Sequence, residues 1–228
     1  RVIWGGDNTI REIRKIEFPS RSTEITFADR YSFGIADVQT VFEMSDDELK
    51  SLTEGFYNDT YLMDQNACST PHLICWKKGG MSDAELEHTK KRFWNGVFKT
   101  AKKYDLDDIK VSDKYTDLCE YVMNVQPASH IVRYDNLLYV CELLELPSDI
   151  MYRCRGRYGM FFEYTLNSFD ELSVLSDTKV QTCAVCGIEQ DVIRDYIKNA
   201  IDVVITVERL SDGRRKITNN NGPNCIYK

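Results

Sequence analysis

The sequence predicts an α/β fold with a largely parallel or mixed sheet, because helix and strand signals alternate along most of the chain. Two capping boxes, Ser45 with Glu48 and Ser82 with Glu85, mark the beginnings of long helices. The apolar run at residues 73–76 is typical of a buried strand. With 228 residues, the chain can bury a core as one large domain or two small ones.

The first half of the chain contains the elements with the clearest signals. Residues 2–4 predict a strand that runs into Gly5-Gly6, after which Asp7 can cap a short helix. Residues 24–35 look extended and are rich in aromatic side chains. Apolar residues at helical spacing follow each capping box, at positions 49, 52 and 56 and at positions 86, 93, 97 and 101. A third helix is expected over residues 112–124.

Strand signals dominate the second half. They cover residues 130–133, 137–143, 160–166, 179–186 and 203–207. Ser168 with Glu171 opens a short helix, and another helix carries apolar residues at 192, 193, 196 and 197. Residues 213–228 are polar and rich in Asn, so we expect a tail that is loose or packed on something else.

The composition excludes several classes of protein. With 43% hydrophobic and 29% charged residues, the chain is ordinary for a folded protein. A formal charge of −7 argues against nucleic-acid binding. No apolar stretch reaches the roughly 20 residues of a membrane span. We expect no signal peptide, because the chain starts at Arg1 with strand-like residues. Eight scattered cysteines indicate reduced thiols in a cytoplasmic protein. A chain that starts at Arg1 on a strand also suggests a part of a longer protein.

Cys68 is the candidate catalytic residue. It lies between an amphipathic segment and the apolar run at 73–76, flanked by small and polar residues, where a thiolate can face a cleft. Thiolates are nucleophiles suited to acyl transfer, since thioesters exchange readily with thiols. The alternative is a buried structural cysteine.

The Gly5-Gly6 turn is a second candidate, because a glycine pair at a helix start lets backbone amides approach a phosphate or a nicotinamide. A plain turn explains it equally well. Cys183 and Cys186 form a single CxxC pair without the further ligands that a structural zinc ion needs. His72 lies four residues after Cys68, which leaves a cysteine hydrolase as another interpretation.

Taken together, three segments resemble the bacterial long-chain acyl-CoA reductases. They are VIWGGDNTIR at 2–11, FADRYSF at 27–33 and DQNACSTP at 64–71. The later segments RGRYG at 155–159, SFDEL at 168–172 and VQT at 180–182 are similar to that family as well. These LuxC-type fatty-acid reductase subunits are a branch of the aldehyde dehydrogenase superfamily. The resemblance covers roughly residues 1–200.

The resemblance implies a three-layer α/β/α catalytic domain of the aldehyde dehydrogenase type. Residues 1–28 would be the end of a Rossmann-like, nicotinamide-cofactor-binding domain. Residues 29–200 would form the catalytic domain with its nucleophilic cysteine, and residues 201–228 a C-terminal strand and tail.

The activity that the resemblance implies is reduction of a long-chain fatty acyl-CoA to an aldehyde with NADPH or NADH. Cys68 would accept the acyl group from CoA or from an acyl-transferring partner, an acyl-protein synthetase. Gly5, Gly6 and Asp7 would lie against the cofactor, no metal would take part, and the protein would be a homo-oligomer. Two other functions stay open: a non-catalytic interaction or scaffold fragment, and a cysteine-dependent thioesterase or hydrolase.

Overall fold

The computed structural model describes residues 1–124, 128–175, 179–197, 203–209 and 215–219. The chain divides into two compact units, Arg1–Arg30 and Tyr31–Lys228. Assignment of these units to a cofactor domain and a catalytic domain stays a prediction. Most of the predicted tail, residues 213–228, lies outside the described residues.

The first unit is a short βαβ segment. Strand β1 (Val2–Trp4) pairs in parallel with β2 (Ile25–Phe27), and helix α1 (Asp7–Arg14) connects them in the chain. The predicted cap by Asp7 is wrong, because the helix cap is Gly6 and makes no side-chain bond. Instead, the backbone N–H of Asp7 donates to the carboxylate of Asp29 at 3.0 Å. A distant carboxylate therefore satisfies one of the unpaired N–H groups at the helix start.

The second unit is built on an eight-stranded mixed sheet in the order β10-β9-β8-β3-β4-β7-β6-β5. The six inner strands are parallel, and the edge strands β5 and β10 run antiparallel to their neighbours. The strands are β3 (Tyr31–Asp37), β4 (Pro71–Lys77), β5 (Ala128–Tyr134), β6 (Leu138–Leu143), β7 (Met160–Leu166), β8 (Val180–Cys186), β9 (Val203–Arg209) and β10 (Arg215–Asn219).

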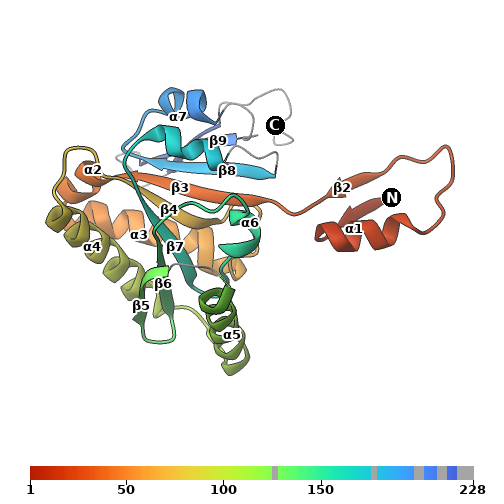
Figure 1. The fold of residues 1–228 in the computed structure, drawn as a ribbon, viewed down its shortest axis with the longest axis horizontal. Helices are drawn as coiled ribbons and strands as arrows, with labels where there is room; N and C mark the ends of the chain where they lie inside the picture. The colour runs from red at the N-terminus through yellow and green to blue at the C-terminus, as the bar shows by residue number, and fades with distance from the viewer. Residues whose placement is uncertain (125–127, 176–178, 198–202, 210–214, 220–228) are drawn as a thin grey trace. The chain divides into compact units, whose positions relative to one another are not determined.

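Helices cover both faces of this sheet, so the predicted three-layer α/β/α architecture is confirmed (Figure 1). On one face pack α2 (Val38–Glu43), α3 (Asp46–Thr60) and α4 (Asp83–Ala101). On the other pack α5 (Asp108–Asn124), α6 (Ile150–Arg153), the 3-10 helix η2 (Phe169–Leu175) and α7 (Gln190–Tyr196). A short 3-10 helix, η1 (Tyr61–Met63), follows α3.

The inner strands β3, β4, β6, β7 and β8 each contribute side chains to both cores, which explains their nearly continuous apolar sequences. In β4, Leu73 and Cys75 pack on the α5 side of the sheet, whereas Ile74 and Trp76 pack on the α4 side. The two predicted capping boxes are both present, at Ser45 and at Ser82.

Among the differences from the predicted elements, three have a clear structural cause. The extended stretch expected over residues 24–35 is interrupted between Phe27 and Tyr31, where the chain passes from one unit to the other. Helix α5 begins four residues earlier than predicted, because the side chain of Asp107 accepts from the backbone N–H of Lys110 at 2.8 Å and caps it. Within the predicted tail, Arg215–Asn219 form β10 because they pair with β9.

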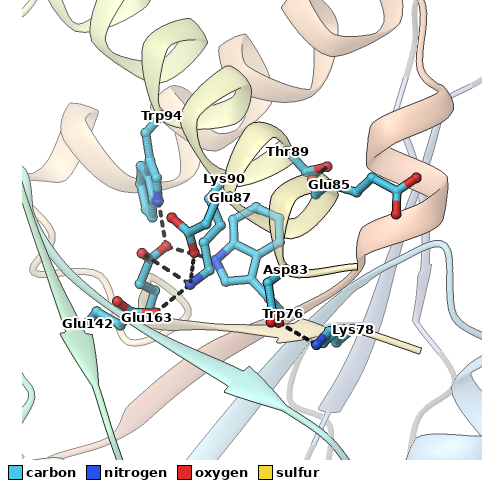
Figure 2. Close-up of polar contacts among 10 residues, drawn as sticks. All are labelled: Trp76, Lys78, Asp83, Glu85, Glu87, Thr89, Lys90, Trp94, Glu142 and Glu163. Atoms are coloured by element: carbon cyan, nitrogen blue, oxygen red, sulfur yellow. Dashed lines mark hydrogen bonds and ion pairs between the residues drawn. The ribbon is translucent and has the colours of Figure 1, made fainter. Parts of the chain in front are cut away.

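A polar cluster lies inside the α4-side core (Figure 2). Glu163 of β7 accepts from the indole N–H groups of Trp76 and Trp94 at 2.9 and 2.7 Å, both on Oε2. Lys90 Nζ lies 2.6 Å from Glu142 Oε1 and 3.8 Å from Glu163 Oε1. Burial raises the pKa of Glu163, although Lys90 and the two indoles oppose that shift. The carboxylate is therefore tolerated in the core only through these partners.

Replacement of Lys90 by an uncharged residue should destabilise the protein, because the buried Glu163 carboxylate loses a partner. We expect Lys90→Met to lower the free energy of unfolding by about 3 kcal/mol, because Glu163 then lacks its cationic partner. Lys91→Met, an exposed neighbour on α4, is the matched control and should change it by less than about 0.5 kcal/mol in urea unfolding. Equal losses for the two variants would show that Lys90 does not compensate Glu163.

Candidate functional site

Cys68 lies on a loop, residues 64–70, between η1 and β4. Its side chain is exposed, so the sulfur is accessible and the alternative of a buried structural cysteine is excluded. The loop enters β4 at the amino ends of the parallel strands β3, β4 and β8. A molecule that reacts with Cys68 therefore approaches it at this edge of the sheet.

Gln65 fixes the loop to the beginning of β7. Its side chain is buried, with 1% of the residue exposed. Its Oε1 accepts from the backbone N–H groups of Gly159 and Met160 at 2.5 and 3.2 Å, and its Nε2 donates to the Met160 carbonyl at 2.9 Å. Gly159 has φ +91°, and a Cβ there would lie 2.2 Å from the Leu137 carbonyl oxygen. The carboxamide of Gln65 thus grips a segment that only glycine can build.

The backbone of the loop is unusual. Asp64 and Gln65 have φ values of +52° and +61°, a left-handed conformation that is costly for residues other than glycine. The carboxylate of Asp64 accepts from Tyr104 Oη and pairs with Lys110 Nζ at 3.3 Å. At the other end, Thr70 Oγ1 donates to the Asp59 carbonyl at 2.8 Å. These contacts hold the strained turn and leave Cys68 projecting from a fixed frame.

Two further side chains contact Cys68 itself. Ser32, fully buried at the beginning of β3, donates its hydroxyl to the Cys68 carbonyl at 2.7 Å. Gln181 of β8 donates its Nε2 to Cys68 Sγ at 3.3 Å. Within the part of the chain that the structure describes, the backbone N–H groups of Cys68 and Ser69 make no hydrogen bond. They are therefore available to an oxygen atom placed next to the sulfur.

His72 is not placed to act as a base for Cys68. Its imidazole is 2% exposed and stacks on Tyr31, with 5.5 Å between ring centroids. Burial, followed by the charge of Arg155, lowers the pKa of His72 to about 3. Its Nδ1 has no hydrogen-bond partner among the described residues. The structure thus shows a neutral imidazole enclosed in the fold, which opposes the cysteine hydrolase interpretation.

The CxxC pair does not form a joint site either. Cys183 packs into the core on the α5 side of the sheet, and Cys186 packs against the core on the α4 side. Their side chains therefore point to opposite faces of β8. Burial raises the pKa of Cys186 to about 11. Both cysteines behave as core residues in this arrangement.

Gly5, Gly6 and Asp7 belong to the first unit, whereas Cys68 belongs to the second. The Gly5 N–H donates to the Phe27 carbonyl at 3.2 Å. A Cβ on Gly6 would lie 3.1 Å from the Asp29 carboxylate, which already occupies the start of α1. A phosphate at this turn would meet that negative charge. The turn therefore suits a neutral group, such as the carboxamide of a nicotinamide ring, better than a phosphate.

Sequence reasoning missed the supporting residues. Asp64 and Gln65 stand in the quoted motif, and Gln181 stands in a later one, but no role was assigned to them. Ser32 stands in the quoted segment at 27–33, but nothing there marked it as a loop anchor. All four act through contacts that the sequence does not reveal locally.

Loss of the Gln65 carboxamide should destabilise the whole unit. We expect Gln65→Leu to lower the free energy of unfolding by about 2 to 4 kcal/mol, because the buried Gly159 N–H loses its partner and the Met160 backbone loses two hydrogen bonds. The control is Gln39→Leu, an exposed glutamine on α2. If both variants unfold at the same urea concentration, Gln65 does not hold the loop.

The buried imidazole of His72 should make the protein acid-sensitive. His72 stays neutral in the folded chain down to about pH 3, whereas the unfolded chain binds the proton below pH 6.5. Stability is therefore lost as the pH falls between these values, by about 3 kcal/mol from pH 7 to pH 4. His72→Phe cannot titrate, so its unfolding free energy should fall by that much less over the same range. Parallel pH curves for the two proteins would contradict this assignment.

A family model described as acyl-CoA reductase (LuxC) matches residues 1–93, which include Gly5, Gly6, Asp7 and Cys68. No curated protein matches the chain. None of the described helices combines the length and apolar character that crossing a membrane requires.

Solved structures of aldehyde dehydrogenases share the fold. The chain is 12% identical to a Thermus 1-pyrroline-5-carboxylate dehydrogenase with bound NAD, with a TM-score of 0.57 over 90% of this chain and 42% of that one. For an NAD-dependent benzaldehyde dehydrogenase from Corynebacterium glutamicum the identity is 10%, the TM-score 0.56 and the coverage 90% and 46%. The identity to lactaldehyde dehydrogenase from Escherichia coli is 10%, with a TM-score of 0.57 over 90% of this chain and 44% of that one.

The chain thus spans less than half the length of each of these structures. At such low identity they show the fold alone. The expected resemblance is confirmed: residues 1–93 match the LuxC acyl-CoA reductase family, and the chain has the fold of the aldehyde dehydrogenase superfamily.

Proposed function

We propose that this chain is the catalytic half of a nicotinamide-dependent reductase that converts long-chain fatty acyl-CoA to fatty aldehyde through an acyl-Cys68 intermediate. The observation that carries the proposal is an exposed sulfur on a rigidly anchored loop. That loop lies within the segment matched by the acyl-CoA reductase family.

In the first half-reaction, Cys68 exchanges one thioester for another. The thiol gives its proton to water, which reaches the exposed sulfur. The thiolate then attacks the acyl carbonyl, the bond to the CoA sulfur breaks, and CoA leaves as a thiolate that takes up a proton. The unpaired N–H groups of Cys68 and Ser69 can hold the developing oxyanion, which is the role of such donors in acyl transfer.

In the second half-reaction, the thioester carbonyl is reduced. A bound reduced nicotinamide supplies the hydride for that step. Gly5, Gly6 and Asp7 would hold its ring, and the Asp29 carboxylate at the start of α1 fits a neutral carboxamide there. Cys68 then leaves as a thiolate and takes up a proton while the aldehyde departs. We propose NADPH or NADH as the donor, since two of the similar structures are a dehydrogenase with bound NAD and an NAD-dependent dehydrogenase.

The acyl donor and the assembly also belong to the proposal. An exposed sulfur can accept an acyl group from free acyl-CoA or from an acyl-transferring protein partner. The long acyl chain, the partner and a homo-oligomeric state follow from the family resemblance. Thioester hydrolysis by a Cys68–His72 pair is the less favoured function, because His72 is buried and neutral.

Incubation with radiolabelled long-chain acyl-CoA tests the proposal. The wild-type chain should acquire label, and Cys68→Ser should lose at least about 99% of it, because no other described thiol is as exposed. Cys119→Ser, a half-buried cysteine on α5, is the matched control and should label like wild type.

Three outcomes would contradict the reductase. Label that persists in Cys68→Ser would place the acyl group elsewhere. An unlabelled wild-type chain would favour a non-catalytic interaction fragment. Release of the free fatty acid, if it depends on His72 and does not require a nicotinamide cofactor, would identify a hydrolase.

A further inference from the structure

We infer that Gln181 is a further catalytic residue of this site: its carboxamide N–H donates to Cys68 Sγ and favours the thiolate form of that sulfur. The inference deepens the proposed function and rests on it for the identity of the reaction. Its physical basis, the contact between the two side chains, is independent of the substrate.

The contact joins distant parts of the chain. Gln181 Nε2 lies 3.3 Å from Cys68 Sγ, although 113 positions separate the two residues. Among the described residues, Gln181 is the one side chain with a hydrogen bond to this sulfur. The donor therefore reaches the proposed nucleophile directly.

The backbone of β8 changes its pairing at Gln181. Tyr31 of β3 pairs with Val180, and Ser32 pairs with Thr182, so Gln181 has no partner on β3. Extra residues of this kind redirect a side chain, and they are frequent beside active sites. Val180 and Thr182 are buried on either side, whereas Gln181 is partly exposed. The irregularity thus places a polar side chain at the end of a buried strand where it can meet Cys68.

The same short stretch of β3 also holds the backbone of Cys68. Ser32, whose pairing partner is Thr182, donates to the Cys68 carbonyl at 2.7 Å. The Cys68 loop and β8 are thus both positioned against one residue of β3. These contacts with Ser32 and its neighbours hold Gln181 and Cys68 next to each other.

A carboxamide can support a thiolate without removing its proton. The N–H groups of glutamine donate, and its nitrogen does not accept a proton at neutral pH. A hydrogen bond to an anion is stronger than one to the neutral group, so this donor favours the sulfur anion. It would help twice, when Cys68 attacks the acyl carbonyl and when the sulfur leaves the reduced carbon.

Charged residues of both signs lie near this edge, with Asp64 on the Cys68 loop itself. Lys179 lies two residues before Gln181, and the charge of Arg155 acts on the neighbouring His72 and Tyr31. These groups remain in place when Gln181 is replaced. A difference between Gln181 variants therefore reports the carboxamide alone.

Alkylation of Cys68 by iodoacetamide, followed residue by residue with peptide mass spectrometry on the full chain, tests the inference. At pH 7 we expect Gln181→Leu to react about three- to tenfold more slowly than wild type, because less of the sulfur is thiolate. Gln181→Glu should react more slowly still, since its carboxylate repels the thiolate. At pH 10.5, where thiols are largely ionised, Gln181→Leu and wild type should react at similar rates.

Gln39→Leu on the exposed face of α2 is the matched control and should follow wild type at every pH. Equal rates for Gln181→Leu and wild type across the pH range would overturn the inference. A rate loss of the same size at every pH would overturn it as well, since it would indicate a steric effect. The alkylation assay contains no acyl-CoA, so the acyl-labelling experiment can fail while this one succeeds, and the reverse.

Discussion

The site depends on the three hydrogen bonds of the Gln65 carboxamide. They join the loop that carries Cys68 to the turn that begins β7, across 94 or 95 positions of sequence. Because Asp64 and Gln65 adopt left-handed backbone conformations, the loop needs such partners to persist. With the loop held from below, Cys68 can stand exposed and still occupy a defined position. Exposed loops are usually mobile, but here the buried Gln65 side chain keeps the loop ordered while Cys68 remains exposed.

The α4-side core stabilises the same pair of strands further along. Strand β4 leads away from the Cys68 loop, and β7 leads away from the segment that Gln65 grips. The Trp76 side chain of β4 donates to Glu163 of β7, and Trp94 and Lys90 of α4 contact the same carboxylate (Figure 2). Because all these donors must reach one buried carboxylate, β4, β7 and α4 can pack in only one arrangement. The β4–β7 pair is therefore held both at its beginning and at Glu163 in the middle of β7.

Much of the fold could be predicted because its signals are local. The capping boxes at Ser45 and Ser82 and the apolar run at residues 73–76 each depend on residues within a few positions. The supporting contacts could not be predicted, since Gln65 and Gln181 act on partners about a hundred positions away. The cap of α1 was mispredicted for the same reason, because Asp29 supplies it from outside the helix. Sequence reasoning thus proposed a candidate sulfur but did not find the side chains that surround it.

The central claim is that the sulfur of Cys68 carries the acyl group as a thioester. Peptide mapping by mass spectrometry, after exposure of the chain to a long-chain acyl-CoA, tests it most directly. The account predicts one acyl adduct, on the peptide that contains Cys68, which neutral hydroxylamine removes and which reduced nicotinamide releases as aldehyde. An adduct on another residue, one that resists hydroxylamine, or release only as the free acid would contradict it.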